Sequence, residues 1–221
     1  MNRFFTKSIA LIALVAGITA ISTSKAEAAL SLFLCNVEFC AGGSVVQVND
    51  GDATDVNGGV GAITYIGGFG GFSAFSVNSA IGIPIIGSDA SPQTDLHFSA
   101  FGAGEGFIYA QQGPFNAPAS PDPGSFTLNY GGTSTGQVWV QGVVGLAGDP
   151  FTTVGPFSGN FSGSLNLSGA APYFQAIGVH IKQAGGATTG DLHLIPEPVS
   201  LALLGLGLAG VAARRKRQVT A

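Results

Sequence analysis

A strict two-residue alternation over residues 157–168 constrains the fold of this chain more than any other feature of its sequence. In FSGNFSGSLNLS the odd positions carry Phe, Gly or Leu, and the even positions carry Ser or Asn. Only a β-strand places alternate residues on opposite faces, so one face is buried and the other meets water. The same alternation in YFQAIGVHIK predicts that Ile177, Val179 and Ile181 point inward while His180 points outward.

Eight further runs of strand type lie between residues 44 and 194, separated by turn-forming clusters such as NDGD and AGDP. The runs are SVVQV, AITYI, FSAFSV, DLHFSAF, GFIYA, SFTLNY, QVWVQGVV and DLHL. The chain is 46% hydrophobic and holds 16 Phe, enough apolar side chains to bury a core. Short strands at this spacing predict a mostly β chain with a single antiparallel β-sandwich or jelly-roll-like domain.

The first 28 residues have the pattern of a secretory signal peptide. A short basic head precedes an apolar run over residues 9–21, and Ala26 and Ala28 form an A-x-A cleavage site. The run is too short for a comfortable membrane span. We therefore expect cleavage after Ala28 and an exported β-rich domain over residues 29–194.

The expected exported domain is acidic, although the whole chain has a formal net charge of only −4. Between residues 29 and 195, Lys182 stands alone against ten Asp and Glu residues, which leaves a formal charge of −9. Such a surface repels phosphate backbones, so the sequence excludes nucleic acid as a partner.

The chain contains two cysteines, Cys35 and Cys40, within the stretch CNVEFC. In an exported chain such a pair predicts a local disulfide. Metal binding is the weaker alternative because no second cluster of Cys or His accompanies the pair.

The C-terminal region combines an apolar stretch with a block of charge. Residues 199–213 carry no charge and are followed by Arg214, Arg215, Lys216 and Arg217. As a helix the stretch is roughly 22 Å long, at about 1.5 Å per residue, and the basic side chains can extend its reach to the membrane interface. Cations at one end of a span orient that end toward the cytoplasm. We expect one C-terminal transmembrane helix.

The tripeptide Pro196, Glu197 and Pro198 stands immediately before this stretch. A bare membrane anchor has no need of a stiff acidic motif, and the order of the three elements over residues 195–217 resembles the PEP-CTERM family of bacterial exported proteins. The resemblance implies processing by an exosortase, a membrane-embedded protease or transpeptidase with a cysteine nucleophile. By that resemblance the tripeptide is the recognition motif. The family is associated with bacteria that make extracellular polysaccharide and form biofilm.

The stretch NDGDATDVNGG gathers Asp50, Asp52 and Asp55 in a loop that contains glycine. Carboxylate oxygens in such a loop are the ligands that calcium requires. The twelve-residue helix-loop-helix pattern fails, because Gly61 stands where that pattern needs Glu. An acidic turn between strands is the favoured interpretation, calcium is the alternative, and we expect no other cofactor.

His97 and His193 each lie two residues after an aspartate, Asp95 and Asp191 respectively. On a strand each pair shares a face, and an acid beside a histidine is part of a Ser-His-Asp arrangement. No G-x-S-x-G elbow accompanies them, and histidines on the protein surface are the favoured interpretation. We expect no catalytic residues and no enzymatic activity.

These observations predict a non-enzymatic exported protein, held in the inner membrane as a precursor and then sorted to the cell envelope or the extracellular polysaccharide matrix. The expected partners are an exosortase, the inner membrane during sorting and extracellular polysaccharide. A carbohydrate-binding surface module assisted by calcium is one alternative function. A secreted hydrolase is a second, which would use His97 or His193.

Overall fold

Alternating apolar and polar residues form β-strands along most of the chain that the structure describes. The computed structural model describes residues 29–41, 43–69, 72–80, 92–115, 124–146, 148–170 and 172–197. The strands are β1 (Ala29–Cys35), β2 (Val45–Asn49), β3 (Ala62–Phe69), β4 (Phe72–Ala80), β5 (Thr94–Phe101), β6 (Gly104–Phe115), β7 (Gly124–Gly145), β8 (Thr152–Gly169), β9 (Tyr173–Gln183) and β10 (Ala187–Pro196), and η1 (Glu38–Cys40) is a short 3-10 helix.

All of these strands join one antiparallel sheet in the order β2-β1-β6-β9-β7-β10-β5-β4-β3, and β8 pairs with β7. The long strand β7 connects two halves of the sheet. Its residues 126–134 pair with β10, and its residues 137–145 pair with β9. The register with β8 shifts between Ser134 and Val138, where β7 passes from one half to the other.

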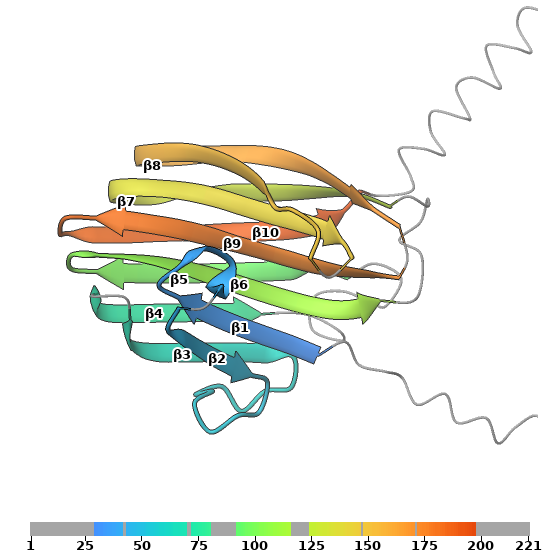
Figure 1. Ribbon diagram of the computed structural model, residues 1–221, viewed down its shortest axis with the longest axis horizontal. Coiled ribbons are helices and arrows are strands. Elements are labelled where there is room, and N and C mark those ends of the chain that lie inside the picture. Colours follow the sequence, from blue (N-terminus) through green and yellow to red (C-terminus); the bar gives the residue numbers. More distant parts are fainter. Residues whose placement is uncertain are drawn as a thin grey trace, which may run out of the picture.

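The sheet curls so that its two halves face each other. Residues of β5 contact β6 and β9, although β10 and β7 separate β5 from β9 in the strand order. The two ends of the sheet also meet, because β3 contacts β1 and β2. Figure 1 shows the β7 and β8 hairpin at one border of the molecule and β2 and β3 together at the opposite border.

One hydrophobic core fills the space between the two halves, with residues from β1, β2, β3 and β5 to β10. Ile177, Val179 and Ile181 of β9 have no exposed surface, which confirms the inward face predicted for this strand. Phe161 and Leu167 of β8 are buried on the apolar face of the alternating stretch. The period of two therefore sorts the side chains between core and solvent as predicted.

The core also encloses polar side chains that bond to one another. Gln175 Nε2 donates to Thr94 Oγ1 at 2.6 Å and to Gln112 Oε1 at 3.1 Å. A second set joins Gln183, Thr188 and Ser134, with the hydroxyls of Ser134 and Thr188 2.8 Å apart. The paired groups of these networks cost little to bury and favour this strand register, whereas Gln175 Oε1 is buried without a hydrogen-bond partner.

The structure confirms a mostly β, antiparallel fold, with two differences in detail. SFTLNY and QVWVQGVV belong to the single strand β7, and the strand β1 was not among the predicted runs.

Two glycines between the two halves of β7 allow the backbone of neighbouring strands to come close. A Cβ at Gly132 would lie 2.2 Å from Thr189 O, and one at Gly136 would lie 2.3 Å from Lys182 O. The predicted signal peptide and C-terminal helix lie outside the described residues.

Candidate functional site

Three aromatic rings lie side by side on the outer face of one half of the sheet. In the strand register Trp139 of β7 pairs with His180 of β9, which pairs in turn with Phe107 of β6. The ring centroids of Phe107 and His180 are 4.1 Å apart, and those of Trp139 and His180 are 4.3 Å apart. Both pairs are stacked, so the rings form a continuous strip across three strands.

Tyr109 continues the strip along β6. Its ring is stacked on that of Phe107 with centroids 6.4 Å apart. Gly178 of β9 lies opposite Tyr109, and a Cβ at that position would come within 2.4 Å of the Tyr109 ring. The glycine therefore leaves the space that the ring occupies. Burial raises the pKa of Tyr109 to about 12, so its hydroxyl stays protonated.

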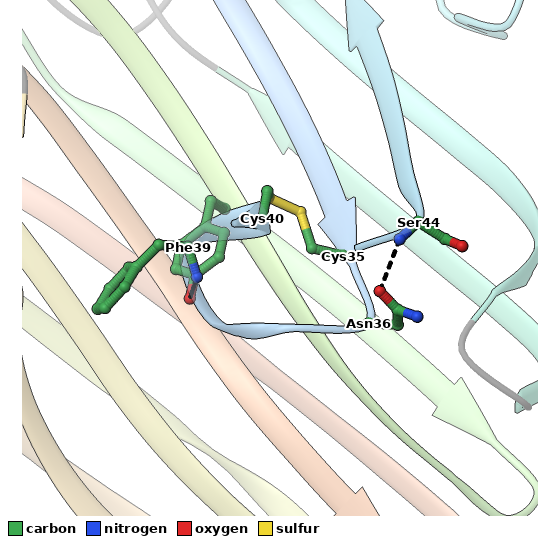
Figure 2. The surroundings of a disulfide bond; sticks show 6 residues. Cys35, Asn36, Phe39, Cys40 and Ser44 are labelled. Carbon is green, nitrogen blue, oxygen red and sulfur yellow. Dashed lines mark hydrogen bonds between the residues drawn. A yellow bond between two sulfur atoms is a disulfide. The ribbon is translucent and has the colours of Figure 1, made fainter. Parts of the chain in front are cut away.

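The loop closed by Cys35 and Cys40 lies beside this strip. The structure joins the two cysteines in a disulfide, with Cα atoms 5.1 Å apart. Ser44 N donates to Asn36 Oδ1 at 2.8 Å across the base of the loop. Figure 2 shows this hydrogen bond and shows the ring of Phe39 directed away from the disulfide.

Phe39 adopts a backbone conformation that is rare for residues other than glycine. Its φ is 54° and that of Cys40 is 58°, both in the left-handed region. The loop holds this conformation because Phe39 N donates to Tyr109 Oη at 3.3 Å and Cys40 N donates to Val37 O at 3.1 Å. Backbone strain of this kind concentrates at functional sites. The Phe39 side chain is 51% exposed despite its size.

A second loop brings Phe151 against Phe39. The two ring centroids are 5.3 Å apart and stacked, and the rings of Phe151 and Tyr109 are also 5.3 Å apart. The loop before Phe151 is held by Asp149, whose Oδ2 accepts a hydrogen bond from Leu146 N at 2.7 Å. We call Phe39, Tyr109 and Phe151 the aromatic cluster.

Two adjoining pockets open beside the aromatic cluster. The larger has a volume of about 370 Å³ and the smaller about 170 Å³. They share Phe39, Gln111, Phe151 and Ala176. The larger is also lined by Val143, Leu146, Gly148, Asp149, Pro150 and Phe174. A pocket of this size with apolar walls and a few polar groups suits a small organic ligand.

Each of the three histidines pairs with an acid on a neighbouring strand. His97 Nδ1 contacts Asp191 Oδ1, and His193 Nδ1 contacts Asp95 Oδ1. His180 Nε2 lies 3.0 Å from Glu105 Oε1. The sequence suggested pairs within one strand, whereas the structure pairs residues across strands.

The pair formed by His97 and Asp191 lines a polar pocket of about 250 Å³, together with Ser99. These residues include the three types of a catalytic triad. The His97 and Asp191 side chains are 57% and 66% exposed, however, and so both lie in water.

The predicted acidic loop is folded around its own carboxylates. Asp55 Oδ1 accepts hydrogen bonds from Asn57 N at 2.8 Å and from Thr64 N at 2.9 Å. Asp52 Oδ2 accepts from Asn49 N at 2.7 Å, and Asp50 Oδ2 accepts from Gly61 N at 2.7 Å. Within the described ranges no group of three or more His, Cys, Asp or Glu side chains could hold a metal ion.

The C-terminal motif begins inside the sheet. Pro196 is the last residue of β10 and pairs with Phe126 of β7. Glu197 N donates to Ser125 O at 2.8 Å. Pro198 and the block from Arg214 to Arg217 lie outside the described residues. Over the residues that are described, no helix is long and apolar enough to cross a membrane.

Sequence reasoning missed the residues of the aromatic cluster and the reciprocal pairing of histidines with acids. Phe39 and Phe151 lie 112 residues apart and in two loops, so no local pattern connects them. A weak signal for the histidine pairs did exist, because the tripeptide DLH occurs at both 95–97 and 191–193. Two antiparallel copies of this tripeptide in register place each aspartate opposite a histidine.

Comparison with known proteins identifies one feature of the chain. Residues 194–217 match the PEP-CTERM protein-sorting motif. No curated protein matches the chain. Among solved structures, the enzymatically active domain of tailspike protein 4 from bacteriophage CBA120 is similar at 12% identity and a TM-score of 0.37. That similarity covers 60% of this chain and 19% of the tailspike chain, and we infer neither fold nor function from it.

Proposed function

We propose, on the basis of the PEP-CTERM motif at residues 194–217, that the chain is a non-enzymatic exported protein that an exosortase recognises and processes. The motif is the single observation that carries this proposal. It directs the chain to the cell envelope or the extracellular space. In the proposed sequence of events the precursor stays in the inner membrane until Pro196, Glu197 and Pro198 are recognised.

The block from Arg214 to Arg217 is proposed to hold the C-terminal end in the cytoplasm during this step. The processed domain then serves in the envelope or the extracellular polysaccharide matrix. Its acidic surface supports a structural or binding role outside the cell and argues against nucleic acid as a partner.

A role without catalysis fits the surroundings of the histidines. Two of them, His97 and His193, form cross-strand pairs with aspartates, and the His97 pair lies open to solvent. Cross-strand side-chain pairs of this kind commonly stabilise β-sheets without any catalytic role. A secreted hydrolase is the second alternative. In that case, replacing His97 or His193 would abolish turnover of the substrate.

The decisive experiment compares intact masses of the protein from a host with an exosortase and from a host without one. We expect wild-type protein to lose its tail beyond about Pro198 only in the first host. Replacing Pro196, Glu197 and Pro198 by alanine should leave a full-length form in the inner membrane of that host. Removing residues 214–217 should instead weaken retention during export. Equal masses in both hosts, tail included, would reduce the motif to a simple anchor.

A second candidate function is binding of carbohydrate, and the pocket beside the aromatic cluster favours it. Its lining includes the apolar side chains of Val143 and Ala176 and the rings of Phe39 and Phe151, and Gln111 supplies an amide. Sugars combine apolar C–H faces with hydroxyl groups, so rings beside an amide suit them. The charged residue in the lining is Asp149, which makes a neutral sugar the better fit. Retention on immobilised polysaccharide, with and without a chelator, tests this function and any need for calcium.

A further inference from the structure

The sorting motif and the folded domain share residues. The motif begins at residue 194, whereas strand β10 continues to Pro196. Leu194, Ile195 and Pro196 pair in register with Leu128, Thr127 and Phe126 of β7. No spacer therefore separates the domain from the residues that a sorting enzyme reads.

Two contacts extend this hold to Glu197. Its backbone N–H donates to Ser125 O at 2.8 Å, and its Oε1 accepts a hydrogen bond from Thr127 Oγ1 at 3.4 Å. The first contact occupies its main chain, and the second occupies the carboxylate that distinguishes the motif chemically. Pro196 and Glu197 are both only partly exposed.

The end of β10 is paired with a strand on one side only. Pairing between β10 and β5 ends at Leu194 and Thr94, so within the described part of the sheet residues 195–197 are paired with β7 alone. Strand ends with few contacts open with little free energy. The end of β10 is therefore a latch that can open while the core of the sheet stays intact.

A protease binds a peptide through the backbone groups and side chains on either side of the cleaved bond. Extended peptides commonly bind by adding a strand, which requires the main-chain groups that Glu197 here shares with β7. We propose that the β-domain holds Pro196 and Glu197 against Ser125, Phe126 and Thr127, and that release of this latch precedes capture of the motif by the exosortase. This inference rests on the proposed function, and it makes Thr127 a positioning residue for the sorting reaction.

The expected effect is moderate. Each hydrogen bond shifts the balance between held and released motif by about two- to ten-fold, given typical net hydrogen-bond strengths. Opening the latch should therefore speed processing by a similar factor and leave its site unchanged. Fully blocked processing of the wild type is not expected.

The test measures the rate at which precursor becomes processed protein in a pulse-chase experiment in a host with an exosortase. Thr127→Val removes the donor to Glu197 and keeps a β-branched side chain that suits the strand. Thr133→Val is the matched control, because Thr133 lies on the same strand and contacts Thr189, remote from the motif. A second variant inserts Gly-Ser between Ile195 and Pro196, which moves the motif past Ser125. Its control inserts Gly-Ser after Gly185, in the turn between β9 and β10.

We expect T127V to be processed at least about two-fold faster than wild type, the Gly-Ser insertion before Pro196 to be faster still, and both controls to match wild type. Rates equal to wild type in T127V and in the first insertion would overturn the latch while leaving exosortase sorting intact. Absence of processing in every form, wild type included, would overturn sorting and the latch together.

A second measurement does not depend on the enzyme. In full-length precursor from a host without exosortase, the Glu197 amide should exchange with solvent more slowly in wild type than in the variant with the insertion before Pro196. Equal exchange rates would contradict the latch, because they would mean that Ser125 O does not protect this amide.

Discussion

His97 of β5 and Asp191 of β10 face each other across the sheet, with Nδ1 of the histidine against Oδ1 of the aspartate. Two residues along the same strands, Asp95 faces His193 in the reverse arrangement. The leucines between them, Leu96 and Leu192, are buried in the core. A repeated DLH tripeptide therefore joins the two strands through histidine–aspartate pairs on the outside and through apolar contact on the inside.

Exchanging the residues of one pair tests this relationship. His97→Asp alone should place two carboxylates opposite each other and destabilise the fold by about 0.2–1 kcal/mol. Combining it with Asp191→His should restore most of the loss, because the pair is re-formed with reversed polarity. Thermal unfolding of the two variants and of Asp191→His alone completes the cycle. A double variant no more stable than H97D would show that this pair does not contribute to pairing of the strands.

Glu105 predicts how stability depends on pH. The hydrogen bond from Lys182 holds the pKa of this carboxyl below its usual 4.5, with a further contribution from His180 and against the effect of burial. Lys182 Nζ lies 2.9 Å from Glu105 Oε2. Because the folded state binds this proton less readily than the unfolded state, the stabilisation is present above pH 4.5 and is lost as pH falls through the lowered pKa.

Glu105→Gln should therefore lower the melting temperature at pH 7 slightly, by an amount that corresponds to less than about 1 kcal/mol for an exposed pair. The difference from wild type should shrink below pH 4. Melting curves across this range provide the measurement. A difference that stays constant with pH would mean that packing, rather than charge, accounts for the effect of the substitution.

The strands could be predicted from the sequence where alternation is strict. Ile177, Val179 and Ile181 have the predicted burial. A shift of the strand register by one residue would move all three side chains to the other face of the sheet, so the register is strongly specified. The continuity of β7 could not be predicted, because Gly131, Gly132 and Gly136 look like strand breakers. Gly132 and Gly136 must be glycine because backbone of β10 and of β9, respectively, approaches them closely, and this approach exists only in the folded sheet.

The sorting motif could be predicted from the sequence because its recognition is local and linear. Its attachment to the domain could not, since Glu197 contacts Ser125 and Thr127, about 70 residues away. The aromatic cluster likewise depends on contacts between residues that are far apart in the sequence. Phe39 and Phe151 meet because two loops cross the same face of the sheet, and only the strand order brings these loops together.

The disulfide between Cys35 and Cys40 remains a prediction for the exported protein. Protein alkylated directly in the cell envelope should show no free thiol by mass. Closing so short a loop contributes roughly 2 kcal/mol in the chain-entropy account, so replacing both cysteines by alanine should lower stability by about that amount. Detection of two alkylated cysteines would contradict the pairing.

The acidic loop gives a prediction about calcium. Asp55 accepts hydrogen bonds from the backbone of Gly51, Asn57 and Thr64, so its carboxylate is already occupied. Asp55→Ala should destabilise the protein by about 0.5–1.5 kcal/mol through the lost hydrogen bonds. Calcium should leave the melting temperature of wild type unchanged. A rise on adding calcium, absent from D55A, would instead establish the loop as a calcium site.

Phe39 forms part of the lining of the proposed carbohydrate site. Phe39 is half-exposed at the rim of the larger pocket and contacts both other members of the aromatic cluster. Phe39→Ala removes an aromatic ring from the lining of this pocket. The disulfide and the backbone hydrogen bonds of the loop do not involve the Phe39 side chain, so the loop itself should persist. Phe101→Ala is the matched control, because Phe101 is 43% exposed and lies outside the pocket lining.

We expect wild-type protein and F101A to be retained by immobilised neutral polysaccharide and F39A to be released, with a loss of about ten-fold in affinity if one stacked ring contributes about 1.5 kcal/mol. Acidic polysaccharide should retain all three forms less well, because Asp149 lies in the lining and the domain as a whole is negative. Equal retention of F39A and wild type would place any sugar site elsewhere on the domain. Stronger retention on acidic than on neutral polysaccharide would contradict the inferred ligand class, since the carboxylate of Asp149 would then lie against a like charge.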